Sequence, residues 1–188
     1  MSSVRLYILG ALAAEGPMHG HQLKLLAEQE HVHYWTDVSV GSLYGAIKRL
    51  AAEGLIEELR VEREGNYPER QVYEITEAGS AALAELRREG LSTVVFKPDP
   101  FDLAMSRLDP ATLDGVGSVV AERLATLQAM LAASEAQRAK ADRYLTVNER
   151  FVLSHKSARL AAEIEWHNAL ATELPRIIAD ESARTKAP

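Results

Sequence analysis

One short stretch of the chain gathers small, hydroxylated and basic side chains. Its members are Ser39, Ser42, Tyr44, Lys48 and Arg49. Hydroxyl groups can donate hydrogen bonds to phosphate oxygens or to base edges, and lysine and arginine neutralise phosphate charge. A second set lies around a later turn and comprises Arg63, Tyr67 and Arg70. These residue types indicate contact with a phosphate backbone and the bases it carries.

Other chemistries find less support in the sequence. The chain has 6 histidines and no cysteine. His19 and His21, or His31 and His33, are two apart, which would put both on one side of a strand but on different sides of a helix. No nearby carboxylate completes a ligand set, so we expect surface or DNA-facing donors and no metal. The sequence lacks Gly-x-Ser-x-Gly, His-Glu-x-x-His and a glycine-rich phosphate loop, and we expect no enzyme activity and no cofactor.

The elements that must position the two sets follow from hydrophobic spacing. The pattern predicts three helices, a two-stranded hairpin and a further helix, over residues 4–14, 20–30, 39–53, 55–62, 70–75 and 77–89. At 100° per residue, Ile47 and Leu50 each fall within about 40° of Leu43, so the three residues form the buried face of the third helix. This order predicts a winged helix-turn-helix, whose third helix enters the major groove while the two-stranded β wing contacts the backbone or the minor groove.

The outward face of the third helix is unusual for a helix that only has to be soluble. Opposite Leu43 lie Gly41, Gly45, Lys48 and Ala52. A glycine inside a helix costs about 1 kcal/mol relative to alanine. Close approach to a groove or a phosphate backbone gives a reason for that cost; the alternative is a solvated face that tolerates a glycine.

The charge balance places a condition on DNA binding. The chain has a formal charge of −6, and residues 1–90 hold 9 Lys and Arg against 14 Asp and Glu. A DNA-binding domain usually has a net positive charge. The interpretation therefore requires cations clustered on one side and a dimer that spans two half-sites. The alternative is a winged-helix protein–protein interaction module without DNA binding.

The second half of the chain is predicted to be all α. We place the boundary at the irregular, proline-containing stretch after residue 91, giving a winged-helix domain over 1–91 and a helical dimerisation and effector domain over 92–188. A long helix reaches about Arg143, and a capping box of Thr146 with Glu149 opens the last helix. A coiled-coil-type seam along that helix predicts a homodimer, because two long helices are too few for a core. The seam includes Leu153, Leu160, Ile164, Leu174 and Ile178.

Large aromatic residues suggest a site for a small planar ligand. Three of them are suited to stacking on such a ligand: Tyr34, Trp35 and Trp166. Ordinary packing explains Trp166 equally well. The start of the chain lacks a signal pattern, and charged or polar residues interrupt each apolar stretch before about 18 residues. We therefore expect a cytoplasmic, mainly α protein without a membrane partner.

Four stretches, at suitable spacing, carry a family resemblance. Leu6–Leu12, Met18–Leu23, Ser42–Ile56 and Tyr73–Gly79 together resemble PadR-type transcriptional regulators. Pro100–Ala104 and the two helices after it resemble the C-terminal helical domain of the longer members. The resemblance implies a homodimeric, sequence-specific DNA-binding repressor that a small ligand releases.

Two departures from the family pattern bear on which DNA sequence is read. The family often has proline in the first turn of the third helix, where this chain has Val40 and Gly41. The second-helix glycine motif often carries tyrosine, where this chain has His21.

Overall fold

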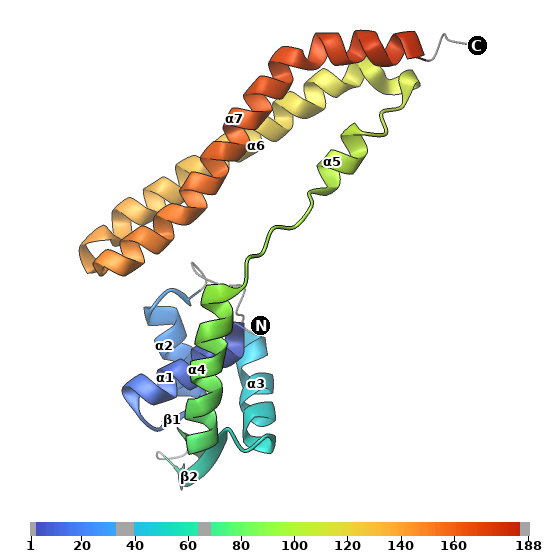
Figure 1. The fold of residues 1–188 in the computed structure, drawn as a ribbon. Coiled ribbons are helices and arrows are strands. Elements are labelled where there is room, and N and C mark those ends of the chain that lie inside the picture. The colour runs from blue at the N-terminus through green and yellow to red at the C-terminus, as the bar shows by residue number, and fades with distance from the viewer. Residues whose placement is uncertain (1–2, 33–39, 64–68, 185–188) are drawn as a thin grey trace. The chain divides into compact units, whose positions relative to one another are not determined.

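The structure is a computed structural model that describes residues 3–32, 40–63 and 69–184. It divides into two compact units, Met1–Val95 and Phe96–Pro188. The first unit contains, in chain order, α1 (Ser3–Glu15), β1 (Met18–His19), α2 (Gly20–Gln29), α3 (Val40–Ala52), β2 (Ile56–Glu62), β3 (Arg70–Ile75) and α4 (Glu77–Ser92) (Figure 1). The predicted fold class, a mainly α protein with an N-terminal winged helix, is confirmed.

The core of the first unit forms where α1, α2 and α3 pack against the sheet and α4. Leu43, Ile47 and Leu50 of α3 are buried, as their spacing predicts. They meet Ile8 and Leu9 of α1 in one apolar cluster. Each fully buried leucine or isoleucine contributes about 1.5–3 kcal/mol to stability, so the inner face of α3 fixes which residues the helix turns outward.

A third strand extends the predicted hairpin. The sheet has the order β1-β3-β2, and β1 pairs antiparallel with β3 through Met18 opposite Tyr73 and His19 opposite Val72. The pairing of β2 with β3 confirms the two strands of the wing. A strand of two residues has no measurable alternation, which is why the sequence pattern did not predict β1.

The start of α4 is held by a tight junction with the loop before β2. As predicted, Thr76 caps α4: its Oγ1 accepts from the Gly79 N–H at 3.0 Å and donates to the Gly54 carbonyl at 2.8 Å. The Leu55 carbonyl accepts from the Thr76 N–H at 3.2 Å. A Cβ added to Gly79 would lie 1.9 Å from that carbonyl oxygen, so this position requires glycine.

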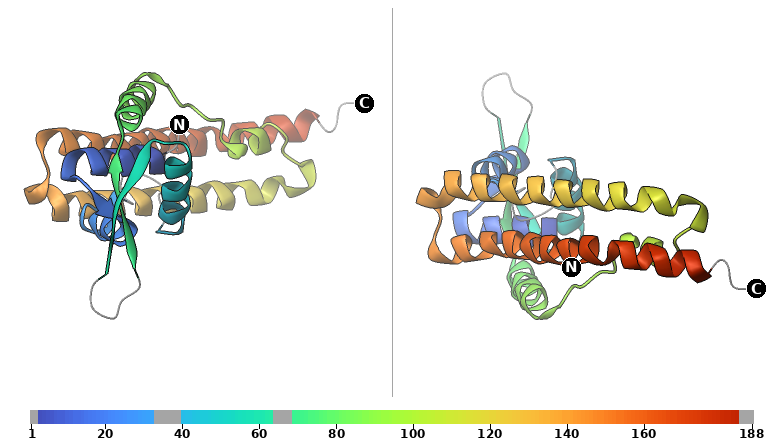
Figure 2. Two further views of the ribbon diagram at one scale, coloured as in Figure 1. Left: turned by 90° about the horizontal axis from the view of Figure 1, so that it is seen from below. Right: turned by 90° about the horizontal axis from the view of Figure 1, so that it is seen from above.

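The second unit is built on two long antiparallel helices, α6 (Leu113–Ala141) and α7 (Val147–Arg184), which lie side by side in all views (Figures 1 and 2). Ahead of them come α5 (Pro100–Met105) and the short helix η2 (Pro110–Thr112), and η3 (Asp142–Tyr144) lies in the connection between them. The predicted capping box is present: Glu149 Oε2 accepts from the Thr146 N–H at 2.7 Å, and Thr146 Oγ1 accepts from the Glu149 N–H at 3.2 Å. Along the described residues, every helix is too short or too polar to cross a lipid bilayer.

Candidate nucleic-acid interface

The exposed face of α3 carries the side chains that the sequence assigned to it. Tyr44 is 45% exposed, and Lys48 and Arg49 are exposed as well, while Ser42 is half-buried. The helix contains no acidic residue. Because its buried face is fixed by the core, these donors and cations are presented together on a rigid element.

The first turn of α2 supports Tyr44 from the side. A Cβ added to Gly20 would lie 2.8 Å from Cε1 of the Tyr44 ring and 3.3 Å from Cδ1 of Ile47. The glycine therefore lets α2 and α3 approach closely, and it holds the tyrosine ring against the start of α2. The sequence analysis did not single out Gly20; its place in the Met18–Leu23 stretch was the available signal.

The end of α3 is tied to α1 by a bidentate ion pair. Arg5 donates from Nη1 and Nη2 to the two carboxylate oxygens of Glu53, at 2.7 and 2.6 Å. These hydrogen bonds lower the pKa of the Glu53 carboxyl. Arg49, the other cation near Glu53, lies over Gly45, with Nη1 3.4 Å from the position of an added Cβ. The Glu53 carboxylate, which follows the basic end of α3, is thus matched by a cation from another helix.

The wing has a mixed charge. Arg63 is exposed, and Arg70 is half-buried at the start of β3. On β2, Arg60 forms an ion pair with Glu62 at 2.6 Å, and further glutamates are exposed on the same strand. The clustering of cations that DNA contact requires is therefore more complete on α3 than on the wing.

Four of the predicted site residues lie outside the described residues: Ser39 and Tyr67 of the proposed DNA contacts, and Tyr34 and Trp35 of the proposed ligand site. Among the residues that are described, no three His, Asp or Glu side chains come together in a way that could hold a metal ion.

His19 differs from its sequence-based interpretation as a surface donor, since it is only 6% exposed. Its ring caps α2: Nδ1 accepts from the Gln22 N–H at 3.0 Å, and the Gln22 side chain accepts from the His19 N–H at 2.9 Å. Nε2 lies 3.5 Å from Nη1 of Arg70. Histidine is not among the residues that usually cap helices, so this role could not be recognised from residue type.

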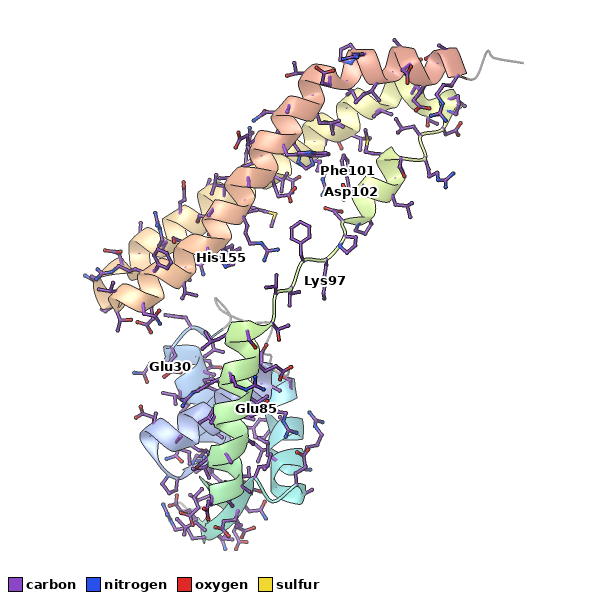
Figure 3. All side chains as sticks on the ribbon, in the orientation of Figure 1. Glu30, Glu85, Lys97, Phe101, Asp102 and His155 are labelled. Atoms are coloured by element: carbon purple, nitrogen blue, oxygen red, sulfur yellow. The ribbon has the colours of Figure 1, made fainter. Side chains whose placement is uncertain are left out.

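In the second unit, Trp166 belongs to a cluster that joins α5 to the long helices. It is 49% exposed and makes edge-to-face contacts with Phe101 and with His167, at centroid distances of 6.1 and 5.0 Å. Arg123 lies over the Phe101 ring at 4.4 Å. Phe101, labelled in Figure 3, lies on the side of α5 that faces this pair of helices.

A polar network runs beneath these rings. Arg123 donates from Nε to Nε2 of His167 at 2.9 Å and forms an ion pair with Asp99, the N-cap of α5. His167 is 1% exposed, and its Nδ1 lies 2.8 Å from the Glu163 carbonyl oxygen. Because Nε2 accepts from Arg123, the proton of the neutral ring lies on Nδ1, which donates to that carbonyl. The sequence analysis identified none of these partners.

The predicted seam of α7 is partly used within one chain. Leu160 and Leu174 are 8% and 6% exposed in the single chain, while Leu153, Ile164 and Ile178 are half-buried. An added Cβ on Gly117 of α6 would lie 3.8 Å from Leu174. The reason is that α6 offers an apolar stripe of its own, so it covers residues that the pattern assigned to a partner chain.

Comparison with known proteins bears on the first unit most directly. Residues 8–85 match the model of the Transcriptional regulator PadR-like family. The chain is also 40% identical over 87 residues to the transcriptional regulator Rv3488 of Mycobacterium tuberculosis, a match that covers 46% of this chain and 75% of the relative. The chain belongs to the PadR-like family. Its members are transcriptional regulators rather than enzymes.

Solved structures extend the similarity of this PadR-like chain to both units. PadR of Bacillus subtilis in complex with operator DNA superimposes with a TM-score of 0.68 at 19% identity, covering 92% of this chain and 99% of that one. The PadR-like regulator BC1756 of Bacillus cereus gives a TM-score of 0.58 at 22% identity, with coverages of 93% and 99%. Bacillus subtilis PadR in complex with p-coumaric acid gives 0.65 at 18% identity, with coverages of 92% and 98%. At these identities the likeness establishes a shared fold.

Proposed function

We propose that this PadR-like chain is a homodimeric, sequence-specific DNA-binding repressor that a small ligand releases. The observation that carries the DNA-binding part is the outer face of α3, where Tyr44, Lys48 and Arg49 are exposed opposite a fully apolar inner face. The solved complex of the Bacillus subtilis protein with operator DNA, which has the same fold, supports this assignment.

Each residue of the interface has a role that its chemistry suits. Ser42 and Tyr44 donate hydrogen bonds from the first turns of α3, and Lys48 neutralises a phosphate. Arg49 can form two parallel hydrogen bonds to a guanine in the major groove. On the wing, Arg63 and Arg70 contact the phosphate backbone of the DNA. We assign Ser39 and Tyr67 to the same interface. This division assigns sequence reading to α3 and positioning to the cations around it.

The proposal is tested by selecting binding sequences from a random duplex library with the full chain, then measuring the affinity for the selected duplex by fluorescence anisotropy. Arg49→Ala is expected to cost about 1–3 kcal/mol, or about 5- to 150-fold in affinity, and to relax the sequence preference at one position. Arg88→Ala is the matched control, since it removes an exposed arginine of the same unit from α4. Failure to select any duplex, or equal losses in both variants, would contradict the assignment.

The homodimer is proposed from the apolar side chains that the second unit leaves exposed. On α7 these include Val147, Phe151 and Val152. Sedimentation equilibrium is expected to give a dimer for the parent and a monomer for Phe151→Glu with Val152→Glu, because paired chains would bury the new charges. Leu25→Glu in α2, at a leucine of the first unit that is 49% exposed, is the control that should stay dimeric. A monomeric parent would refute the proposal.

Release by a ligand is proposed from the half-exposed Trp166 ring and its contact with Phe101, and from the p-coumaric acid complex of the Bacillus subtilis protein. We expect p-coumaric acid, used as the first probe, to quench tryptophan fluorescence and weaken binding to the selected duplex. Trp166→Phe should reduce the quenching while keeping an aromatic ring in place.

Repression is tested separately with a reporter gene placed behind the selected duplex. The chain should silence this reporter, and increased expression would indicate an activator instead.

A further inference from the structure

His19 occupies the junction of three elements in the first unit. It is the last residue of β1, it precedes the first residue of α2, and it pairs with Val72 of β3. Its ring is almost wholly buried, with its two nitrogens in separate contacts. A titratable group in this position is coupled to the packing of all three elements.

The hydrogen bonds of His19 fix where its protons can lie. A backbone N–H can only donate, so Nδ1, which accepts from the Gln22 N–H at 3.0 Å, must present its lone pair. The proton of the neutral ring is therefore on Nε2. A second proton would have to go to Nδ1, where it would meet the Gln22 N–H and break the cap of α2.

The charges around the ring also oppose a second proton. Arg70 on β3 lies 3.5 Å from Nε2, and the ring of His21 on α2 stacks on that of His19 at a centroid distance of 6.1 Å. Among the described residues, Glu62 on β2 favours the charged ring. Burial, followed by the guanidinium of Arg70, lowers the pKa of His19 below its ordinary value. The folded state thus disfavours the charged form of this histidine.

His19 also lies between two residues of the proposed interface. Arg70 belongs to the wing set and contacts the ring directly. On the other side, the backbone of Gly20, the next residue, abuts the ring of Tyr44 on α3. If the cap of α2 opens, Gly20 moves relative to Tyr44, and the charged ring repels Arg70. Both contacts with the duplex are then displaced.

We infer that His19 is a positioning residue for DNA binding that acts only in its neutral form, so that acidification releases the duplex. This inference rests on the proposed function. Its sign is opposite to what protonation of a DNA-facing histidine would give, because an added cation at the interface normally strengthens binding to phosphate.

The test is the affinity of the full chain for the selected duplex between pH 7.5 and pH 5.0 at constant salt. The dissociation constant should rise with falling pH below the pKa of His19. The rise should reach up to tenfold per pH unit for each His19 in the bound protein whose protonation blocks binding. In H19N, an asparagine oxygen can cap α2 without titrating, so the ratio of affinities at the two pH values should approach one. H21N, the control at the neighbouring histidine, should keep the parent's loss.

Two further measurements make the outcome decisive. Far-UV circular dichroism at each pH should retain the helical signal while binding is lost; a helical signal lost in step with binding would overturn the inference. In the parent, the pKa of His19 followed by NMR should fall further when the duplex is bound, a readout that needs no variant. An affinity that is constant or rises in acid, or an acid loss that persists in H19N, would overturn the inference and leave the proposed function standing. Absence of binding at pH 7.5 would overturn both.

Discussion

The contact between Gly79 and the Leu55 carbonyl predicts that Gly79→Ala destabilises the winged helix. In an open helical position this substitution stabilises a protein by about 1 kcal/mol. Here the added Cβ would lie 1.9 Å from the carbonyl oxygen and 2.8 Å from Cγ1 of Ile75. Since ordinary carbon–oxygen contacts are about 3.3 Å, the start of α4 and the loop before β2 must separate by about 1.4 Å.

That separation removes identifiable interactions. It lengthens the hydrogen bond from the Thr76 N–H to the Leu55 carbonyl, now 3.2 Å, which is worth about 1 kcal/mol net. It also disturbs the cap between Thr76 Oγ1 and the Gly79 N–H, worth about 1 kcal/mol. Overpacking typically adds 1–3 kcal/mol. After subtracting the gain in helix propensity, we expect a loss of about 2–4 kcal/mol.

Differential scanning calorimetry of the full chain provides the assay. For a unit of this size, about 1 kcal/mol shifts the midpoint by about 4–8 °C, so the first unit of Gly79→Ala should melt at least about 8 °C below the parent. Gly10→Ala in α1 is the matched control, because an added Cβ there meets no atom within 4 Å. Its gain of about 1 kcal/mol in helix propensity should raise the midpoint by about 4–8 °C. A Gly79→Ala variant as stable as Gly10→Ala would refute the packing that we describe.

Three further predictions follow from the same structure. Leu50→Ala should lower the free energy of unfolding of the first unit by about 2–5 kcal/mol in chemical denaturation, because Leu50 is fully buried. Asp99→Asn should lower the melting temperature of the second unit near pH 6, since the Phe101 N–H and then Arg123 lower the Asp99 pKa. Stability from a depressed carboxyl pKa is present above the unfolded value of about 3.9 and is lost as pH falls through the folded one, so the difference between variant and parent should shrink as the pH falls below about 3.9. Lys48→Ala should make the salt dependence of duplex binding shallower, by about one phosphate contact per bound subunit, without changing the melting temperature.

The first unit was largely predictable because its elements are specified locally. The spacing of Leu43, Ile47 and Leu50 determined the inner face of α3, and Thr76 was recognisable as a cap from its type and place. The outward face of α3 was then assigned as the side opposite these buried residues. Such features depend on side chains a few residues apart, which a sequence displays directly.

Contacts between residues distant in the chain could not be predicted in this way. β1 exists because β3 offers it a hydrogen-bonding edge, and the burial of His19 depends on the same pairing. The approach of Gly20 to Tyr44, and of Gly79 to Leu55, is visible only once helices and loops are placed. The seam of α7 was assigned to a partner, whereas α6 covers part of it, because helical spacing reveals an apolar stripe but not its occupant.

The hydrogen bonds around His167 have a consequence for the alignment of α6 with α7. Apolar side chains such as Val120 of α6 and Leu160 and Leu174 of α7 are buried along the pair. Apolar contacts are non-directional, so they do not by themselves oppose a slide of one turn, about 5.4 Å. Such a slide would strand a buried imidazole away from Arg123 and would separate the guanidinium from Asp99. The directional bonds around His167, together with the 3.1 Å hydrogen bond between the Ser134 and Ser157 hydroxyl groups, therefore fix the register of α6 against α7.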